Sequence, residues 1–187
     1  PTINPPTLQL RYFQKKVEQY IEWLDQIEPA WGWKFPETYL IPNFVEKTFP
    51  NAKIIHLVRD GRDVAFKNHS TDRPKKIGHH VLKKANALGE TSRENQAALS
   101  WAYQLDRFEE FAQQTKLPIH NLRFEELCSN PIATVEKVSE FIERPMTEDV
   151  REYLKSNINK EKIAQYKNHD QKKISQIKNL IAPHLKH

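Results

Sequence analysis

One stretch decides the fold of this chain: Ile54-Ile55-His56-Leu57-Val58-Arg59-Asp60-Gly61-Arg62-Asp63-Val64-Ala65-Phe66-Lys67. Lys53 to Val58 is short, apolar and rich in β-branched residues, as is typical of a buried parallel strand. Asp60-Gly61 supplies a turn, and we expect Asp63 to Asn68 to begin a helix. The stretch therefore predicts a strand, a turn and a helix, with Arg59 at the carboxyl end of the strand.

Hydrophobic periodicity on both sides extends this unit. The predicted elements are a helix over Leu8 to Ile27, a short helix over Asn43 to Phe49, a long surface loop with partial helix over 70–95, an amphipathic helix over Asn95 to Gln114, a strand over Pro118 to Phe124, a turn over Glu125 to Asn130, and a helix over Ile132 to Ile142 that Asn130-Pro131 begins. This order predicts an α/β fold in three layers, with a central parallel sheet flanked by helices. Its 187 residues are in the range of one domain, which we place at 1–187.

Composition limits the class of protein. The mean hydropathy is −0.77 and 28% of the residues are charged, and no run approaches the roughly 18 apolar residues of a spanning helix. The single cysteine, Cys128, excludes an intrachain disulfide and favours a reducing compartment, so a cytoplasmic location is expected. The net charge of +5 is concentrated from Arg151 onward, where nine Lys and Arg face three Asp and Glu. A basic end of this kind suits a polyanionic ligand, although a solvated lysine-rich face is the simpler explanation.

Arg59 is the main candidate for binding an anion. Ligands of open α/β sheets bind beyond the carboxyl ends of the strands, and a guanidinium there can donate two hydrogen bonds to a phosphate. Lys67, eight residues later, could reach the same group. The alternative is that Arg59 and Arg62 pair with Asp60 and Asp63 at the surface.

Val58-Arg59-Asp60-Gly61-Arg62-Asp63 resembles the 3′-phosphate-binding segment of sulfotransferases, most closely the tyrosylprotein sulfotransferases and their bacterial relatives. The resemblance implies a donor, 3′-phosphoadenosine 5′-phosphosulfate, whose 3′-phosphate is held by Arg59 and a Ser eight residues later. Lys67 stands at that Ser position, and Ser70 is a second candidate.

Three further stretches are similar to the family, in the family's order. Trp33-Lys34-Phe35-Pro36 with Phe49-Pro50-Asn51-Ala52-Lys53 resembles the lead into the strand, and implies that Lys34 stabilises charge in the transition state. Leu122-Arg123-Phe124-Glu125 resembles the second strand and places Phe124 near the nucleotide. Ile163-Ala164-Gln165-Tyr166-Lys167 resembles the loop that closes over the donor, and so implies donor contacts for Tyr166 and Lys167.

The resemblance also leaves gaps. Nothing in Pro1 to Ile27 resembles the family's phosphosulfate loop, so we expect that loop to precede this region and the chain to be a fragment. Glu37 is a candidate general base, with a helix-start or surface role as its alternative. His79-His80 has no third ligand at metal spacing, so no metal is expected.

The acceptor is a small molecule, glycan or peptide, and the basic residues Arg73, Lys75, Lys76, Lys83 and Lys84 suit an anionic one. A homodimer stays open. Four readings therefore remain: a sulfotransferase, a catalytically degenerate nucleotide-binding relative, a P-loop kinase relative, and a basic nucleic-acid-binding module. A kinase would need an acidic Mg²⁺ site, and nothing in this sequence resembles one. The nucleic-acid module, which we do not expect, lacks interleaved aromatic residues in the basic tail.

Overall fold

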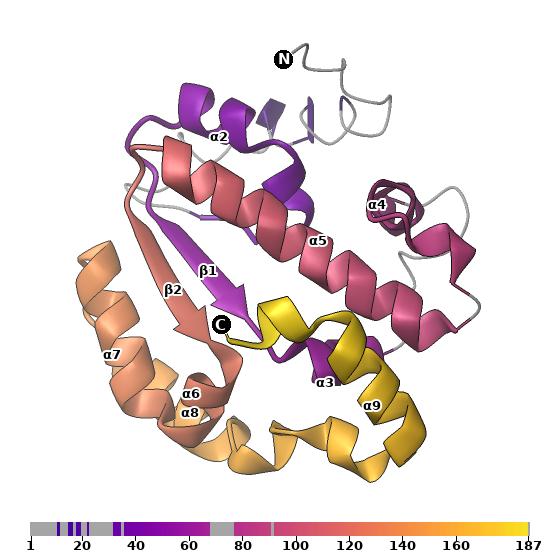
Figure 1. Cartoon of the computed structure of the whole chain (residues 1–187). Coiled ribbons are helices and arrows are strands. Elements are labelled where there is room, and N and C mark those ends of the chain that lie inside the picture. The colour runs from indigo at the N-terminus through magenta and orange to yellow at the C-terminus, as the bar shows by residue number, and fades with distance from the viewer. Residues whose placement is uncertain are drawn as a thin grey trace.

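A computed structural model describes residues 11, 15–16, 18–19, 22, 32–34, 36–67, 77–90 and 92–186. Its centre is a parallel pair of strands, β1 (Ile54–Val58) and β2 (Ile119–Arg123), in which His56 lies opposite Asn121. Helix α5 (Arg93–Gln114) covers one face, where the ring of Phe108 stacks on His56 with centroids 3.5 Å apart. Helix α7 (Pro131–Ile142) covers the other face only along β2, where Phe141 lies 5.3 Å from His120, whereas Ile55 and Leu57 of β1, which the sequence predicts to be buried, are 42% and 51% exposed. Helix, sheet and helix thus form three layers (Figure 1).

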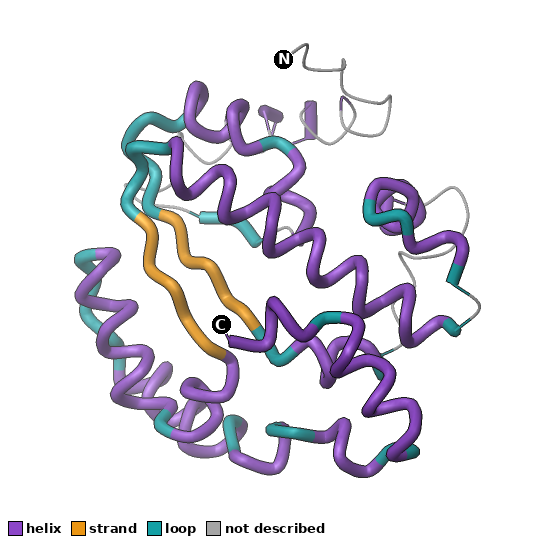
Figure 2. Tube along the Cα trace, viewed as in Figure 1, coloured by secondary structure: helices purple, strands orange, loops and turns teal. Residues whose placement is uncertain are grey.

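Helices make up most of the remaining described chain (Figure 2). They are η1 (Pro36–Leu40), α2 (Pro42–Thr48), α3 (Gly61–Ala65), α4 (Ile77–Lys84), η3 (Ala87–Gly89), α6 (Phe124–Ser129), α8 (Glu148–Asn157), η4 (Lys160–Lys162), η5 (Gln165–Asn168), α9 (Gln171–Leu180) and η6 (Ala182–Lys186). Helix α9 packs beside α3 and α5, so the C-terminal part of the chain returns to the carboxyl end of β1 (Figure 1).

The sequence predictions for both strands, α2, α5 and α7 are confirmed within one or two residues. Two were wrong. The predicted turn over Glu125 to Asn130 is mostly helix α6, whose first turn contains Glu125 and Glu126 and so has carboxylates at the positive end of the helix dipole. Helix α3 begins at Gly61, before the predicted Asp63, because the carboxylate of Asp60 accepts a hydrogen bond from the backbone N–H of Arg62 at 2.8 Å and caps the helix.

The predicted loop over 70–95 contains α4 and η3 within its described residues. Most of the predicted helix over Leu8 to Ile27 lies outside the described residues.

The main core lies where α3, α5 and α9 meet, around Trp101 of α5. It includes the fully buried Ile177 and Ile181. The indole N–H of Trp101 donates to the backbone carbonyl of Arg59 at 3.0 Å, which fixes the chain at the end of β1. Gly61 lies directly against this ring, because a Cβ atom there would be 2.4 Å from Cε3 of Trp101. Gly61 therefore allows α3 to approach α5, and this contact positions Arg59.

Gly61→Ala should lower the free energy of unfolding by about 1–3 kcal/mol, because the added methyl group overpacks the contact with Trp101. Gly89→Ala is the matched control, because no atom lies within 4 Å of a Cβ built there. It should change stability by less than about 0.5 kcal/mol. Urea unfolding followed by tryptophan fluorescence measures both, and equal midpoints for the two variants would contradict this account of the contact.

Candidate anion-binding site

A cavity of about 470 Å³ opens beyond the carboxyl end of β1. One wall comes from Arg59, Asp63, Phe66 and Lys67, which belong to β1, α3 and the residues that follow them. The other wall comes from residues between 161 and 169, in and around η4 and η5. Segments about 100 residues apart in the sequence therefore face one another across the cavity.

The guanidinium of Arg59 is held on three sides. Its Nε and Nη2 donate to Oδ2 of Asp63 at 3.3 and 3.0 Å, and Nη2 also donates to the backbone carbonyl of Lys162 at 2.8 Å. Its Cζ lies 4.3 Å from the ring centroid of Phe124. Within the described part of the chain Nη1 makes no hydrogen bond, so it is the donor that a ligand could use.

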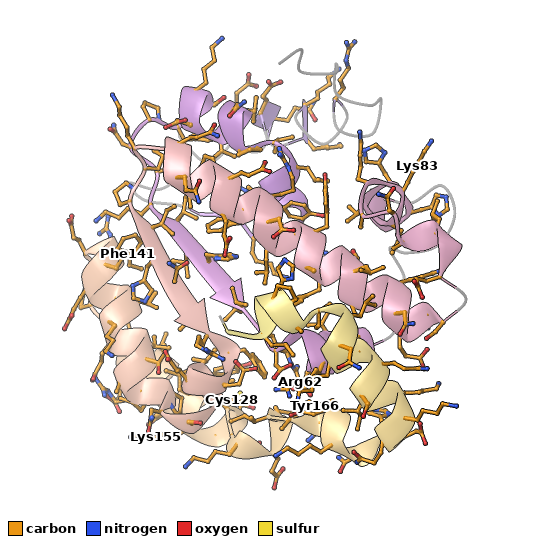
Figure 3. All side chains as sticks on the ribbon, in the orientation of Figure 1. Arg62, Lys83, Cys128, Phe141, Lys155 and Tyr166 are labelled. Atoms are coloured by element: carbon orange, nitrogen blue, oxygen red, sulfur yellow. The ribbon has the colours of Figure 1, made fainter. Side chains whose placement is uncertain are left out.

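The pairing of both arginines with the neighbouring aspartates, which the sequence left open, is present. Arg62 pairs with Asp60, with Nη2 and Oδ2 at 2.6 Å, and its Cζ lies 4.3 Å from the ring centroid of Tyr166. Figure 3 shows Arg62 and Tyr166 side by side. The Arg59 pair, however, is not a surface pair, because the side chains of Arg59 and Asp63 are only 14% and 0% exposed.

Lys67 lines the cavity together with Arg59 and Lys162, and Asp63 and Glu161 are acidic residues of the same lining. Partial burial, and then repulsion by Arg59, lower the pKa of Lys67. Attraction by Asp63 opposes this shift, and repulsion by Lys162 adds a smaller lowering. A cluster of cations that destabilise one another's charge gains energy when an anion enters. The arrangement therefore suits a phosphate or sulfate group.

Tyr166 is buried in the opposite wall and donates its backbone N–H to Oδ1 of Asp63 at 2.8 Å. Beside it, the ring of His169 stacks on Phe66 with centroids 4.0 Å apart and planes 4° from parallel. Tyr166 was predicted from the sequence, whereas Lys162 and His169 were not. Lys162 contributes a backbone carbonyl, which no residue type reveals, and the Phe66–His169 contact joins positions 103 residues apart.

The structure brings together Arg59, Lys67, Phe124 and Tyr166 of the predicted site residues. Lys167 is an exposed residue of η5 that does not line the cavity. Lys34 is exposed, and its neighbour Trp33 packs on Phe49 near the amino end of β1, away from Arg59. Ser70 and the side chain of Glu37 lie outside the described residues. The roles of Lys34, Glu37 and Ser70 stay predictions.

Other kinds of site have less support. In the described ranges, no three His, Cys, Asp or Glu residues are placed to ligate a metal. Burial raises the pKa of the Cys128 thiol, which favours its protonated form. None of the described helices combines the length and apolar character needed to cross a membrane.

Comparisons with known proteins identify the family and the fold. A family model described as the sulfotransferase family matches residues 4–149, and the chain belongs to this family. Its structure is similar to a solved sulfotransferase domain from the curacin biosynthetic pathway, with a TM-score of 0.59 and 18% identity over 88% of this chain and 67% of that one. At this identity the likeness shows the fold, and it confirms the predicted α/β architecture. The comparison with curated proteins gives no match.

The lowered pKa of Lys67 predicts a pH dependence of anion binding. A bound phosphate raises that pKa again, so binding takes up a proton and affinity falls as the pH rises toward 10.5, the ordinary pKa of lysine. Lys67→Arg should bind with little pH dependence in this range, because arginine stays charged. Titration calorimetry with 3′,5′-diphosphoadenosine at several pH values measures this. A wild-type affinity that stays constant would contradict the assignment of Lys67.

Proposed function

We propose that the chain takes its sulfuryl group from 3′-phosphoadenosine 5′-phosphosulfate and that the cavity beside Arg59 binds the 3′-phosphate of this donor. The observation that carries the proposal is the position of Arg59 at the carboxyl end of β1, with Nη1 making no hydrogen bond to the described residues and Lys67 lining the same cavity. Family membership supports sulfuryl transfer in general. The particular donor is inferred from the resemblance of residues 58–63.

The reaction requires few protein groups. The acceptor hydroxyl oxygen forms a bond to sulfur, the bond between sulfur and the bridging phosphate oxygen breaks, and the hydroxyl proton passes to a base. The donor supplies the activated sulfuryl group and leaves as 3′,5′-diphosphoadenosine. Arg59 holds a phosphate that does not react, and such remote binding aligns the reacting centre. By resemblance, Lys34 stabilises the negative charge that develops on oxygen, and Glu37 is the candidate base.

Two alanine variants test these roles separately. Arg59→Ala should weaken binding of 3′,5′-diphosphoadenosine by roughly 10-fold to 100-fold, because it removes a charge-assisted hydrogen-bond donor. Lys34→Ala should lower kcat by roughly 100-fold while donor affinity changes little. The assay is transfer of radiolabelled sulfate by the full-length gene product to glycan, peptide and phenolic acceptors.

Lys47→Ala, at an exposed lysine in the last turn of α2, is the matched control for Lys34. Unchanged kinetics in both Arg59→Ala and Lys34→Ala would mean that the site is elsewhere. Binding of 3′,5′-diphosphoadenosine without transfer to any acceptor would favour the alternative, a catalytically degenerate relative.

We also infer that the acceptor is anionic. Lys83 and Lys84 are exposed at the end of α4. Partial burial lowers the pKa of the neighbouring His80, and repulsion by Lys84 and Lys83 lowers it further, as expected beside two lysines in one helix turn. An acidic peptide or a charged glycan would be attracted to such a surface.

The double variant Lys83→Ser/Lys84→Ser should raise the KM for an acidic peptide several-fold and leave the KM for a neutral phenol unchanged, because exposed charges act mainly on charged partners. The effect should shrink at high salt. An acceptor preference that stays the same in the double variant would contradict the inference that the acceptor is anionic.

A further inference from the structure

The side chain of Asp63 is completely buried, although it is a carboxylate beside a polar cavity. Each of its oxygens has a partner from a different part of the chain. Oδ2 accepts from Nε and Nη2 of Arg59, and Oδ1 accepts from the backbone N–H of Tyr166 at 2.8 Å. One carboxylate therefore connects the two walls of the cavity.

On the first wall, Asp63 determines which edge of Arg59 faces the ligand. The carboxylate occupies Nε and one hydrogen of Nη2, and the carbonyl of Lys162 accepts from Nη2 as well. The planar guanidinium has a fixed fork of donors, so engaging one edge fixes the direction of the others. Nη1 is therefore oriented before a ligand binds, so no binding free energy is lost in ordering the Arg59 side chain.

On the second wall, Asp63 positions residues 160–169. This segment consists of two short 3₁₀ turns, η4 and η5, joined by Ala164, whose φ of 55° is in the left-handed region. Such short turns have few hydrogen bonds of their own. The contacts of Asp63 with Tyr166 and of Arg59 with Lys162 therefore set where the segment lies.

We propose that Asp63 is a positioning residue of the donor site, which orients Arg59 and anchors residues 160–169 without contacting the donor. The inference rests on the proposed function, because it assumes that the cavity binds the donor's phosphate. It predicts that removing the charge of Asp63 weakens anion binding, the opposite of what charge neutralisation alone would give. If Asp63 only neutralised Arg59, removing its charge would make the cavity more positive and anion binding tighter. If it positions Arg59, the same change weakens binding.

The test compares Asp63→Asn with Asp60→Asn in the full-length protein. The first substitution keeps the shape of the side chain but places an amide N–H₂ against the donors of Arg59 or Tyr166. The second changes the other Arg–Asp pair, outside the cavity lining, and asparagine still caps α3. Asp63→Asn should weaken binding of 3′,5′-diphosphoadenosine tenfold or more, on the order expected for a charged hydrogen bond. Donor KM should rise while acceptor KM stays unchanged, and Asp60→Asn should bind like the wild type.

A second readout follows the segment itself. Lys160, Lys162 and Lys167 are exposed trypsin sites, and Asp63→Asn should be cut there faster than Asp60→Asn. If Asp63→Asn fails to fold, hydrogen exchange on the wild type replaces it: the Tyr166 amide should be protected without ligand and more protected with 3′,5′-diphosphoadenosine. An amide that exchanges freely overturns the proposal.

The outcomes separate the two proposals. A wild type that binds no 3′,5′-diphosphoadenosine overturns the donor assignment and, with it, this role for Asp63. A wild type that binds, together with an Asp63→Asn variant that binds equally or more tightly, overturns the positioning role alone.

Discussion

The buried ion pair between Arg59 and Asp63 is the interaction on which the rest of this structure depends. Asp63 is fully buried, and a buried carboxylate is unfavourable unless it is paired and hydrogen-bonded. Arg59 supplies the charge and the Tyr166 backbone supplies the remaining hydrogen bond. The pair itself forms where α3 follows β1 closely, and it is fully hydrogen-bonded only when residues 160–169 return to the same place. Close packing of Gly61 against Trp101 and the hydrogen bond from Trp101 to the Arg59 carbonyl meet the first condition.

The sequence was enough to predict the frame around this pair. The apolar, β-branched run of residues 53–58 and the long amphipathic pattern of residues 95–114 located β1 and α5 before the structure, but the burial expected for that run was wrong, because Ile55 and Leu57 are exposed. The position of Arg59 at the end of a strand followed from the same pattern. Helix α6 was missed because it has only six residues, too few for a helical period to be seen, and because the hydrogen bond that Glu125 accepts from the Asp60 backbone is a contact between distant parts of the chain.

The details of the cavity could not be predicted for a different reason. The second wall is made by residues that meet the first only after the chain has passed through α5, β2 and four further α-helices, α4, α6, α7 and α8. Whether the Lys162 carbonyl faces Arg59, or His169 faces Phe66, depends on that whole path and on the left-handed backbone at Ala164. Local periodicity contains no such information. Family resemblance identified Tyr166 in this region but gave no geometry.

Lysine in place of the serine expected by resemblance changes how the site would recognise a phosphate. A serine hydroxyl offers one directional hydrogen bond, whereas an ammonium group is a point charge whose donors rotate. Geometric recognition then falls to Arg59, whose planar fork can align a phosphate, and Lys67 contributes attraction. Because partial burial and then repulsion from Arg59 lower the pKa of Lys67, that attraction is largest when an anion lies between the cations. Asp63 makes such a site compatible with folding, because it neutralises Arg59, one of the three cations. The same contact fixes the orientation of the Arg59 guanidinium, which determines how a phosphate is aligned.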